Sequence, residues 1–244
     1  MSDTIPKISR RPSHRLIYAG NSHEAFFRGL VLGARSLGFE HCGYAIGVPL
    51  QRKSWQFVMM NNFPRSWQER YRRRDFCTID PTLLYAEKSV WPLTWSSELF
   101  DTEALSDLSK EARAVGFNHG WTQPFRDSHG KFGALTLARS QDAITAEEVR
   151  EKQAMLQLLA LAAHTVLFPA LLARYQNESL AKLTLREIDF LQLASQGSTA
   201  GEMAEAMGVT ERTANFHISN AMEKLGVSNK THAVALAIRL GLLD

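Results

Sequence analysis

The feature that most constrains the fold is a change of pattern close to residue 180. Upstream of it, helical and strand patterns alternate along the chain; downstream, only short helical segments separated by single glycines occur. The stretch RYQNESLAK at 174–182 is polar and unpatterned, which is typical of a linker. A chain of 244 residues is long enough for two modest domains. We therefore predict domains over 1–173 and 183–244, joined by the linker 174–182.

The upstream part has the pattern of helices that cover a sheet. Apolar residues at three- and four-residue spacing predict helices, and segments rich in aromatic and β-branched residues predict strands. The helices are expected over 23–37, 64–74, 103–115 and from about 145 to at least 167, and the strands over 41–48, 55–61, 118–125 and 131–139. Pro169 is expected to kink or interrupt the last helix. The fold class is α+β: an N-terminal α-β-α sandwich followed by an all-α domain.

Composition and charge set limits on the function without assigning it. The hydrophobic content of 45% and charged content of 22% are those of a soluble globular protein. Residues 176–244 hold six Lys and Arg against eight Asp and Glu, a net charge of −2, so overall basicity gives no argument for nucleic-acid binding there. No signal peptide or membrane span is expected, and the two cysteines lack metal-ligand or redox spacing. We expect a cytoplasmic protein with no metal and no cofactor.

The segment TAGEMAEAMGVTERTANFHISNAMEKLGV, just after the linker, has the pattern of two short helices and a tight turn. Gly208 permits the turn, and Thr210 is a good N-cap for the second helix. In that helix the inward positions are apolar, and the outward positions are polar: Arg212, Asn215, His217, Ser219 and Lys224. The pattern fits a helix-turn-helix whose second helix enters a DNA major groove. It fits equally a small helical bundle whose polar face only meets water.

The residues from Leu183 to the C-terminus also match a family pattern. The matching positions are Leu183, Thr184, Arg186, Glu187, Leu191, Ala194, Gly197, Glu202, Ala204, Thr213, His217, Lys224, Leu225, Asn229, Lys230 and Ala233, with Ala214 where valine is usual. The region closely resembles the DNA-binding domain of LuxR-type transcription regulators. The resemblance implies that this domain binds double-stranded DNA.

The resemblance also implies roles for individual residues. Asn215 and Ser219 occupy outward positions like those that face bases in the family, and an asparagine amide can pair with adenine. The positions suited to phosphate contact are Arg212, His217, Lys224, Asn229 and Lys230, and Thr213 completes the DNA-binding set. Thr184, Arg186 and Glu187 are expected to cap and brace the first helix. A domain with so few cations is expected to act in a homodimer that reads a palindromic promoter site.

A thinner resemblance extends upstream to about residue 22. Trp67, Tyr71, Asp80-Pro81, Trp95 and Gly120 form, in order and at fitting separations, the set carried by regulators that sense N-acyl-homoserine lactones. The resemblance implies a quorum-sensing regulator with a pocket for this small-molecule autoinducer.

The chemistry of these residues suits such a ligand. Trp67 offers an indole N–H, a donor for the lactone carbonyl, and Asp80 offers an acceptor for the amide N–H. Thr82 and Thr136 offer hydroxyls near the same head group. Tyr71 and Trp95 are expected to form flat walls, and Gly120 to let the backbone approach. The acyl tail is expected among Tyr44, Ile46, Phe57, Met59 and Leu135.

Phe63 departs from the family pattern. Lactone sensors usually carry tyrosine here, whose phenol donates to the ligand's amide carbonyl. Losing that hydroxyl costs roughly 0.5–1.5 kcal/mol if water or Thr136 compensates. The pocket therefore relies on Thr136 or on water, or it accepts a different head group.

Alternatives to the pocket come from ordinary packing. Aromatic residues at helical spacing are usually core, an Asp before Pro is usually a turn or cap, and the run Arg70, Arg72, Arg73, Arg74 is expected to be a solvated helix face.

Alternatives to the function also remain. A solo LuxR-type regulator would answer to another small molecule, or act without ligand. No nucleophile–base pair is found, so no enzyme is expected. Within the helix 145–168, Leu156, Leu159 and Leu161 are expected to face a second subunit.

Overall fold

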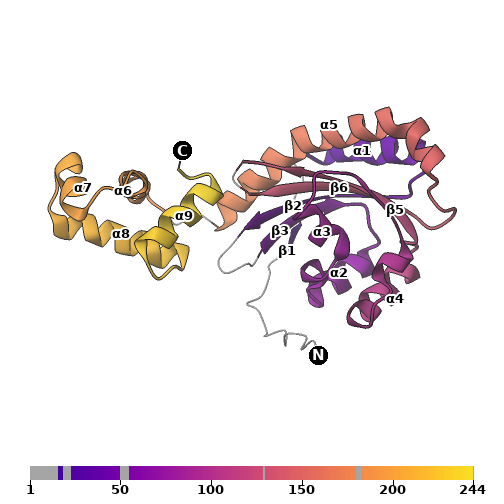
Figure 1. Cartoon of the computed structure of the whole chain (residues 1–244), viewed down its shortest axis with the longest axis horizontal. Coiled ribbons are helices and arrows are strands. Elements are labelled where there is room, and N and C mark those ends of the chain that lie inside the picture. The colour runs from indigo at the N-terminus through magenta and orange to yellow at the C-terminus, as the bar shows by residue number, and fades with distance from the viewer. Residues whose placement is uncertain (1–15, 19–22, 50–54, 129, 180–182, 244) are drawn as a thin grey trace, which may run out of the picture.

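The computed structural model describes residues 16–18, 23–49, 55–128, 130–179 and 183–243, and it forms two domains, with α5 of the first reaching towards the second (Figure 1). The strands are β1 (Leu16–Tyr18), β2 (His41–Pro49), β3 (Trp55–Asn61), β4 (Leu93–Ser96), β5 (His119–Arg126) and β6 (Phe132–Arg139). The helices are α1 (Glu24–Ser36), α2 (Arg65–Arg73), α3 (Pro81–Ala86), α4 (Ser106–Ala114), α5 (Ala146–Ser179), α6 (Leu185–Ser195), α7 (Ala200–Met207), α8 (Glu211–Leu225) and α9 (Lys230–Leu240). Short 3-10 turns lie at Phe76–Thr78, Ser97–Phe100 and Glu103–Leu105.

The N-terminal domain, called the sensor domain below, is built on one sheet in the order β1-β3-β2-β6-β5-β4. Its strands pair antiparallel, except for the parallel pair β1 and β3. Helices α1 and α5 cover one face, and α2, α3 and α4 cover the other (Figure 1). Because successive side chains of a strand point to opposite faces, each strand supplies both layers. The expected α-β-α sandwich is confirmed.

The two layers have separate cores. Against α1 and α5, the core includes Tyr44, Ile46, Leu135 and Leu156. Against α2, α3 and α4, it is largely aromatic and includes Trp67, Tyr71, Phe76, Trp95 and Phe117. The second core surrounds a cavity.

Helix α5 is longer than expected. It runs without interruption through Pro169 to Ser179, so the predicted linker 174–182 is wrong for residues 174–179; residues 180–182 lie outside the described chain. The polar residues there are compatible with a helix, and Tyr175 is buried in the core beside Leu171. By length and hydropathy the part Ala146–Gln176 could cross a membrane. Its row Leu156, Ala160, Ala163 and Leu167 is instead buried on the sheet, as in a core helix.

The C-terminal domain, called the DNA-binding domain below, is all helical in its described residues. Thr184 and Glu187 form a reciprocal capping box at the start of α6, and Thr199 and Glu202 form another at the start of α7. Phe190, Leu191, Met203, Ile218 and Leu243 belong to its core.

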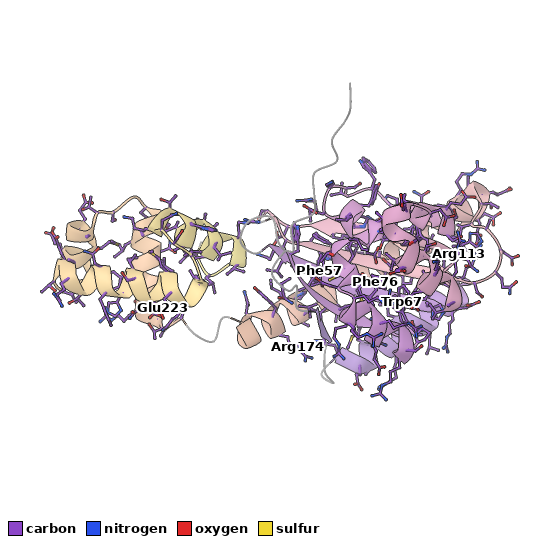
Figure 2. All side chains as sticks on the ribbon, turned by 90° about the horizontal axis from the view of Figure 1, so that it is seen from below. Phe57, Trp67, Phe76, Arg113, Arg174 and Glu223 are labelled. Carbon is purple, nitrogen blue, oxygen red and sulfur yellow. The ribbon has the colours of Figure 1, made fainter. Side chains whose placement is uncertain are left out.

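The two domains touch through the C-terminal end of α9. The Lys131 ammonium donates to the Arg239 carbonyl at 3.0 Å, and the Gln176 amide donates to the Leu240 carbonyl at 3.1 Å. Leu236 and Leu240 pack into the same core as Tyr175. These contacts satisfy carbonyls that a helix end leaves without intrahelical partners. In Figure 2, Arg174 lies near this contact between the two domains, and Glu223 lies within the DNA-binding domain.

Candidate functional site

A cavity lies between the sheet and helices α2, α3 and α4. Seven of the eight residues expected at a ligand site line it: Phe63, Trp67, Tyr71, Asp80, Thr82, Trp95 and Thr136. Asn61 and Gln68 also line it, and the rest of the lining is apolar or aromatic. An apolar chamber with a few convergent polar groups is the usual form of a small-molecule site.

Asp80 is the charged group of this cavity. As N-cap of α3 it accepts from the Thr82 backbone N–H at 2.8 Å and from the Thr82 hydroxyl at 2.7 Å, both through Oδ1. Its Oδ2 accepts from the Tyr71 hydroxyl at 2.8 Å. No cation pairs with it among the described residues. Burial raises the pKa of Asp80, although the Thr82 and Tyr71 hydrogen bonds oppose that rise.

The expectation that Asp80 is either a cap or a ligand group was therefore too narrow. It caps α3 with one oxygen and keeps an acceptor position on the other. Tyr71 is also more than a flat wall, because its hydroxyl holds that carboxylate. The Tyr71–Asp80 bond could not be inferred from sequence, since it joins two elements that the fold brings together.

Trp67 stands at the centre of the aromatic layer. Its ring lies 5.6 Å from that of Tyr71 and 5.0 Å from that of Phe117, and Figure 2 shows it near Phe76. Its indole N–H donates to no acceptor in the described part of the chain. A cavity-lining donor with no protein partner suits a ligand carbonyl.

A chain of hydroxyls leads from Trp95 to the cavity. The Trp95 indole donates to Thr122 Oγ1 at 3.0 Å, and Thr122 Oγ1 lies 3.1 Å from Thr136 Oγ1. Thr122 is fully buried and has no other acceptor for its hydroxyl among the described residues, so this hydroxyl donates to Thr136. The Thr136 hydroxyl is then available as a donor to the cavity. Thr122 was missed because a lone threonine in a strand carries no signal.

Gly120 does not line the cavity. A Cβ there would overlap the Trp95 ring and lie 2.6 Å from the Leu137 carbonyl oxygen. Gly120 pairs with Trp95 across β4 and β5, so its lack of a side chain seats that ring. The expectation that Gly120 lets the backbone approach the ligand is therefore wrong, because the space beside Gly120 is filled by the Trp95 ring.

Phe63 reaches the cavity from the segment before α2. Its ring packs edge-on against Phe117 at 4.9 Å, and a Cβ on Gly43 would come within 2.6 Å of the ring tip. Gly43 pairs with Thr136 across β2 and β6, so Phe63 and Thr136 share one wall.

The expected tail region was partly wrong. Met59 lines the cavity, but Tyr44, Ile46 and Leu135 point to the α1 and α5 face. Phe57 is on the cavity side without lining it. Strand alternation gives two sets of residues but does not say which set faces which helices.

Two of the four arginines expected to be solvated form ion pairs with α4; Arg74 remains exposed as expected, and Arg70 is partly buried. Arg70 pairs with Glu111, and Arg74 pairs with Asp107 at 2.7 Å. Arg72 and Arg73 are exposed as expected. The two pairs join α2 to α4 on the outside of the cavity.

In the DNA-binding domain, α7 and α8 form the helix-turn-helix. Gly208 ends α7 in the left-handed conformation at φ 65°, and Thr210 caps α8 by accepting from the Thr213 N–H. Ala214, Ile218 and Ala221 are buried. Arg212, Asn215 and Ser219 are exposed on the other side, as a groove-facing helix requires.

Several expected phosphate contacts have partners inside the domain. Lys224 pairs with both oxygens of Glu187 at 2.8 Å, and Lys230 donates to the Ser198 carbonyl at 3.1 Å. Asn229 caps α9 by accepting from the His232 N–H. The His217 ring stacks on Phe190 at 4.9 Å. Thr213 shares a hydrogen bond with the Thr210 hydroxyl.

These five side chains therefore each have a structural contact within the domain, and their contact with DNA stays a prediction. The family pattern that marked these residues did not predict their partners inside the domain. Arg212 makes no ion pair with any described residue, which leaves it as the cation of the exposed α8 face.

A small-molecule cavity and a helix-turn-helix in one chain define a ligand-responsive transcription regulator. Residues 22–167 match the family model of the autoinducer binding domain, and residues 181–237 match that of bacterial regulatory proteins of the luxR family. The chain belongs to the LuxR family of quorum-sensing regulators.

Three relatives illustrate the extent of the similarity. The transcriptional activator protein AnoR of Acinetobacter nosocomialis is 38% identical over 210 residues, covering 86% of this chain and 88% of AnoR. The solved structure of CepR2, an N-acylhomoserine-lactone-dependent factor of Burkholderia cenocepacia, is 30% identical with a TM-score of 0.55, covering 60% of this chain and 85% of that one. Escherichia coli SdiA is 26% identical with a TM-score of 0.66, covering 91% and 92%. The last match includes both domains.

Proposed function

We propose that the autoinducer is an N-acyl-homoserine lactone. The observation that carries the proposal is Asp80, a carboxylate in an apolar cavity with no cation partner among the described residues. It can accept from the ligand's amide N–H, a charge-assisted bond that is strong in a dry site. The similar CepR2 is described as dependent on such lactones.

The other polar groups suit the rest of the head group. Trp67 can donate to the lactone carbonyl, and Thr136 can donate to the amide carbonyl. Thr136 thus supplies the donor that the bare ring of Phe63 lacks. Thr82 and Tyr71 hold Asp80, and Trp95 holds Thr136 through Thr122.

The test is expression with and without a panel of acyl-homoserine lactones, followed by mass spectrometry of the purified protein. We expect one lactone to co-purify and to stabilise the protein by mass action. The ring-opened acyl-homoserines are the control, because their carboxylate would enter a cavity that already holds Asp80. A folded, DNA-binding protein with no dependence on any lactone would overturn the proposal.

A second candidate keeps the DNA-binding role and changes the ligand. Phe63 favours it, since one head-group donor is absent from this wall. In that case the mass spectrum would show a bound molecule of another class, or none.

We further infer that the protein acts as a homodimer on a palindromic site in the cytoplasm, and that the sensor domain binds its ligand without catalysis. Leu32 of α1 and Met155, Leu158 and Leu161 of α5 are large, exposed apolar side chains. Such a patch marks an interaction surface. The expected partner surface is corrected here, because Leu156 is buried and Leu159 packs on the core. Leu158→Glu is expected to give monomers in light scattering, whereas Arg72→Glu, at an exposed position of α2 on the other side of the sheet, is expected to leave dimers intact.

A further inference from the structure

Phe216 is a large aromatic side chain exposed on the surface of the DNA-binding domain. It lies on α8 with 60% of its surface exposed, while Ala214 and Ile218 beside it are buried. Its recorded ring contact within the domain is an edge-on approach to His217 at 5.8 Å. His217 is itself stacked on Phe190, and most of the Phe216 side chain is left exposed beside that pair.

The position of Phe216 on α8 indicates what covers it. Arg212, Asn215, Phe216 and Ser219 follow the spacing i, i+3, i+4 and i+7, so they share one face of the helix. The other three are a free cation and two hydrogen-bonding side chains, which suit a nucleic-acid partner. The acidic Glu223 lies two turns further towards the C-terminal end of α8. It is therefore away from the N-terminal part of the helix, which is the part of a recognition helix that contacts base edges.

In a major groove an apolar side chain has one apolar base group to meet. The edges of adenine, guanine and cytosine present donors and acceptors, and only thymine presents a methyl group. We propose that Phe216 is a specificity-determining residue that contacts the 5-methyl group of a thymine in each half-site. The proposal rests on DNA binding through α8.

The test begins with duplexes selected from a randomised library by the full-length protein, expressed in the presence of the panel of N-acyl-homoserine lactones. Each thymine of the selected half-site is then replaced by deoxyuridine, which removes the methyl group and keeps base pairing. For wild type we expect one position at which this replacement weakens binding about fourfold per half-site, the value of one buried methyl-sized group. For Phe216→Ala we expect binding to be weaker by at least that factor, and the same replacement to have no further effect.

Leu185→Ala is the matched control, because Leu185 is 81% exposed in the same domain but lies on α6. It should bind DNA as wild type does and keep the sensitivity to deoxyuridine. Both variants change exposed side chains, so both should keep the wild-type unfolding transition.

The outcomes distinguish a failure of DNA binding from a failure of the thymine contact. If no duplex is selected, DNA binding itself fails. If duplexes are selected but Phe216→Ala retains the deoxyuridine effect, or binds as wild type does, the thymine contact is wrong. If Phe216→Ala weakens dimerisation instead, the residue faces a second protein subunit, and the proposal is again overturned.

Discussion

The two domains each hold a carboxylate that caps a helix, and the two carboxylates differ in whether a cation pairs with them. In the DNA-binding domain, Glu187 is 2% exposed and pairs with Lys224. In the sensor domain, Asp80 caps α3 but has only neutral donors, Thr82 and Tyr71. Burial raises the pKa of both groups, but at Glu187 the Lys224 and Thr184 hydrogen bonds outweigh it and the net pKa is lowered.

The difference separates a carboxylate that is paired within its domain from one that lines a cavity without a cation partner among the described residues. A buried charge with its own counter-ion has no capacity left for a ligand. A buried charge held by neutral hydroxyls keeps an acceptor position at a cost in stability. The sensor domain therefore carries a destabilising unpaired carboxylate at its cavity, whereas the buried Glu187 of the DNA-binding domain is paired.

The largest expected effect comes from the cavity wall. Gly120→Ala would force a Cβ against Trp95 and the Leu137 carbonyl, and we expect it to destabilise the sensor domain by about 3 kcal/mol. All five tryptophans, at 55, 67, 91, 95 and 121, are in the sensor domain, so tryptophan fluorescence follows its unfolding alone.

The control is Gly29→Ala. Nothing lies within 4 Å of a Cβ there, and its position in α1 predicts a gain of about 0.5–1 kcal/mol. Equal effects at the two glycines would contradict the seating role of Gly120.

The next effect tests the paired carboxylate. Lys224→Met leaves Glu187 without a cation, and we expect the DNA-binding domain to lose about 2–3 kcal/mol, reduced because Lys224 is itself about one-third exposed. Circular dichroism should show an early helical transition that the tryptophan signal does not follow. Adding Glu187→Gln should restore part of the loss; a further loss would show that the capping box, not the ion pair, is the stabilising unit.

The unpaired carboxylate should respond differently. Asp80→Asn removes the charge-assisted acceptor, so we expect ligand affinity to fall about 30-fold, about 2 kcal/mol, with the unliganded sensor domain no less stable. Ligand titration by tryptophan quenching measures the first, and denaturant unfolding the second. Asp75→Asn is the control, because Asp75 is close by but does not line the cavity. Unchanged affinity in Asp80→Asn would refute the binding role.

The smallest expected effect is a difference between the pH ranges in which Asp80 and Glu187 gain their protons. Because the pKa of Asp80 is raised above the ordinary 3.8, the folded sensor domain binds this proton first, and the unliganded domain gains stability as pH falls. Ligand affinity should fall through the same raised pKa. The pKa of Glu187 is lowered from 4.5, so its stabilisation is present above 4.5 and is lost only as pH falls below it.

A titration from neutral pH therefore has an expected order. Ligand binding should weaken before the helical signal of the DNA-binding domain changes. Coincident transitions would contradict the distinction between the two carboxylates.

The sequence predicted those helices and strands that are long enough to show a periodic pattern of apolar residues. Apolar periodicity located α1, α2, β2, β3, β5, β6 and α8 to within a few residues. It missed β1, α3 and β4, which are three, six and four residues long and too short to show a period. It ended the first domain too early, because polar residues such as those at 174–179 do not exclude a helix.

The candidate site was predictable where residues act alone. Trp67, Asp80 and Thr136 follow from the donor and acceptor chemistry of their side chains. The Tyr71–Asp80 bond, the support of Thr136 by Thr122, and the pairing of Lys224 join segments 9, 14 and 37 residues apart. No local pattern encodes such pairs, because the fold creates them.

The contact at α9 affects how such regulators can be recombined. A chimera that joins this sensor domain to another DNA-binding domain at residue 180 would keep Lys131 and Gln176 but lose the α9 carbonyls they bind. The Lys131 ammonium, 3% exposed, would keep only Asp127 as its ion-pair partner among the described residues. A graft that respects the chemistry would keep the end of α9 from this protein, or replace Lys131 as well, so the exchangeable unit does not end at the linker.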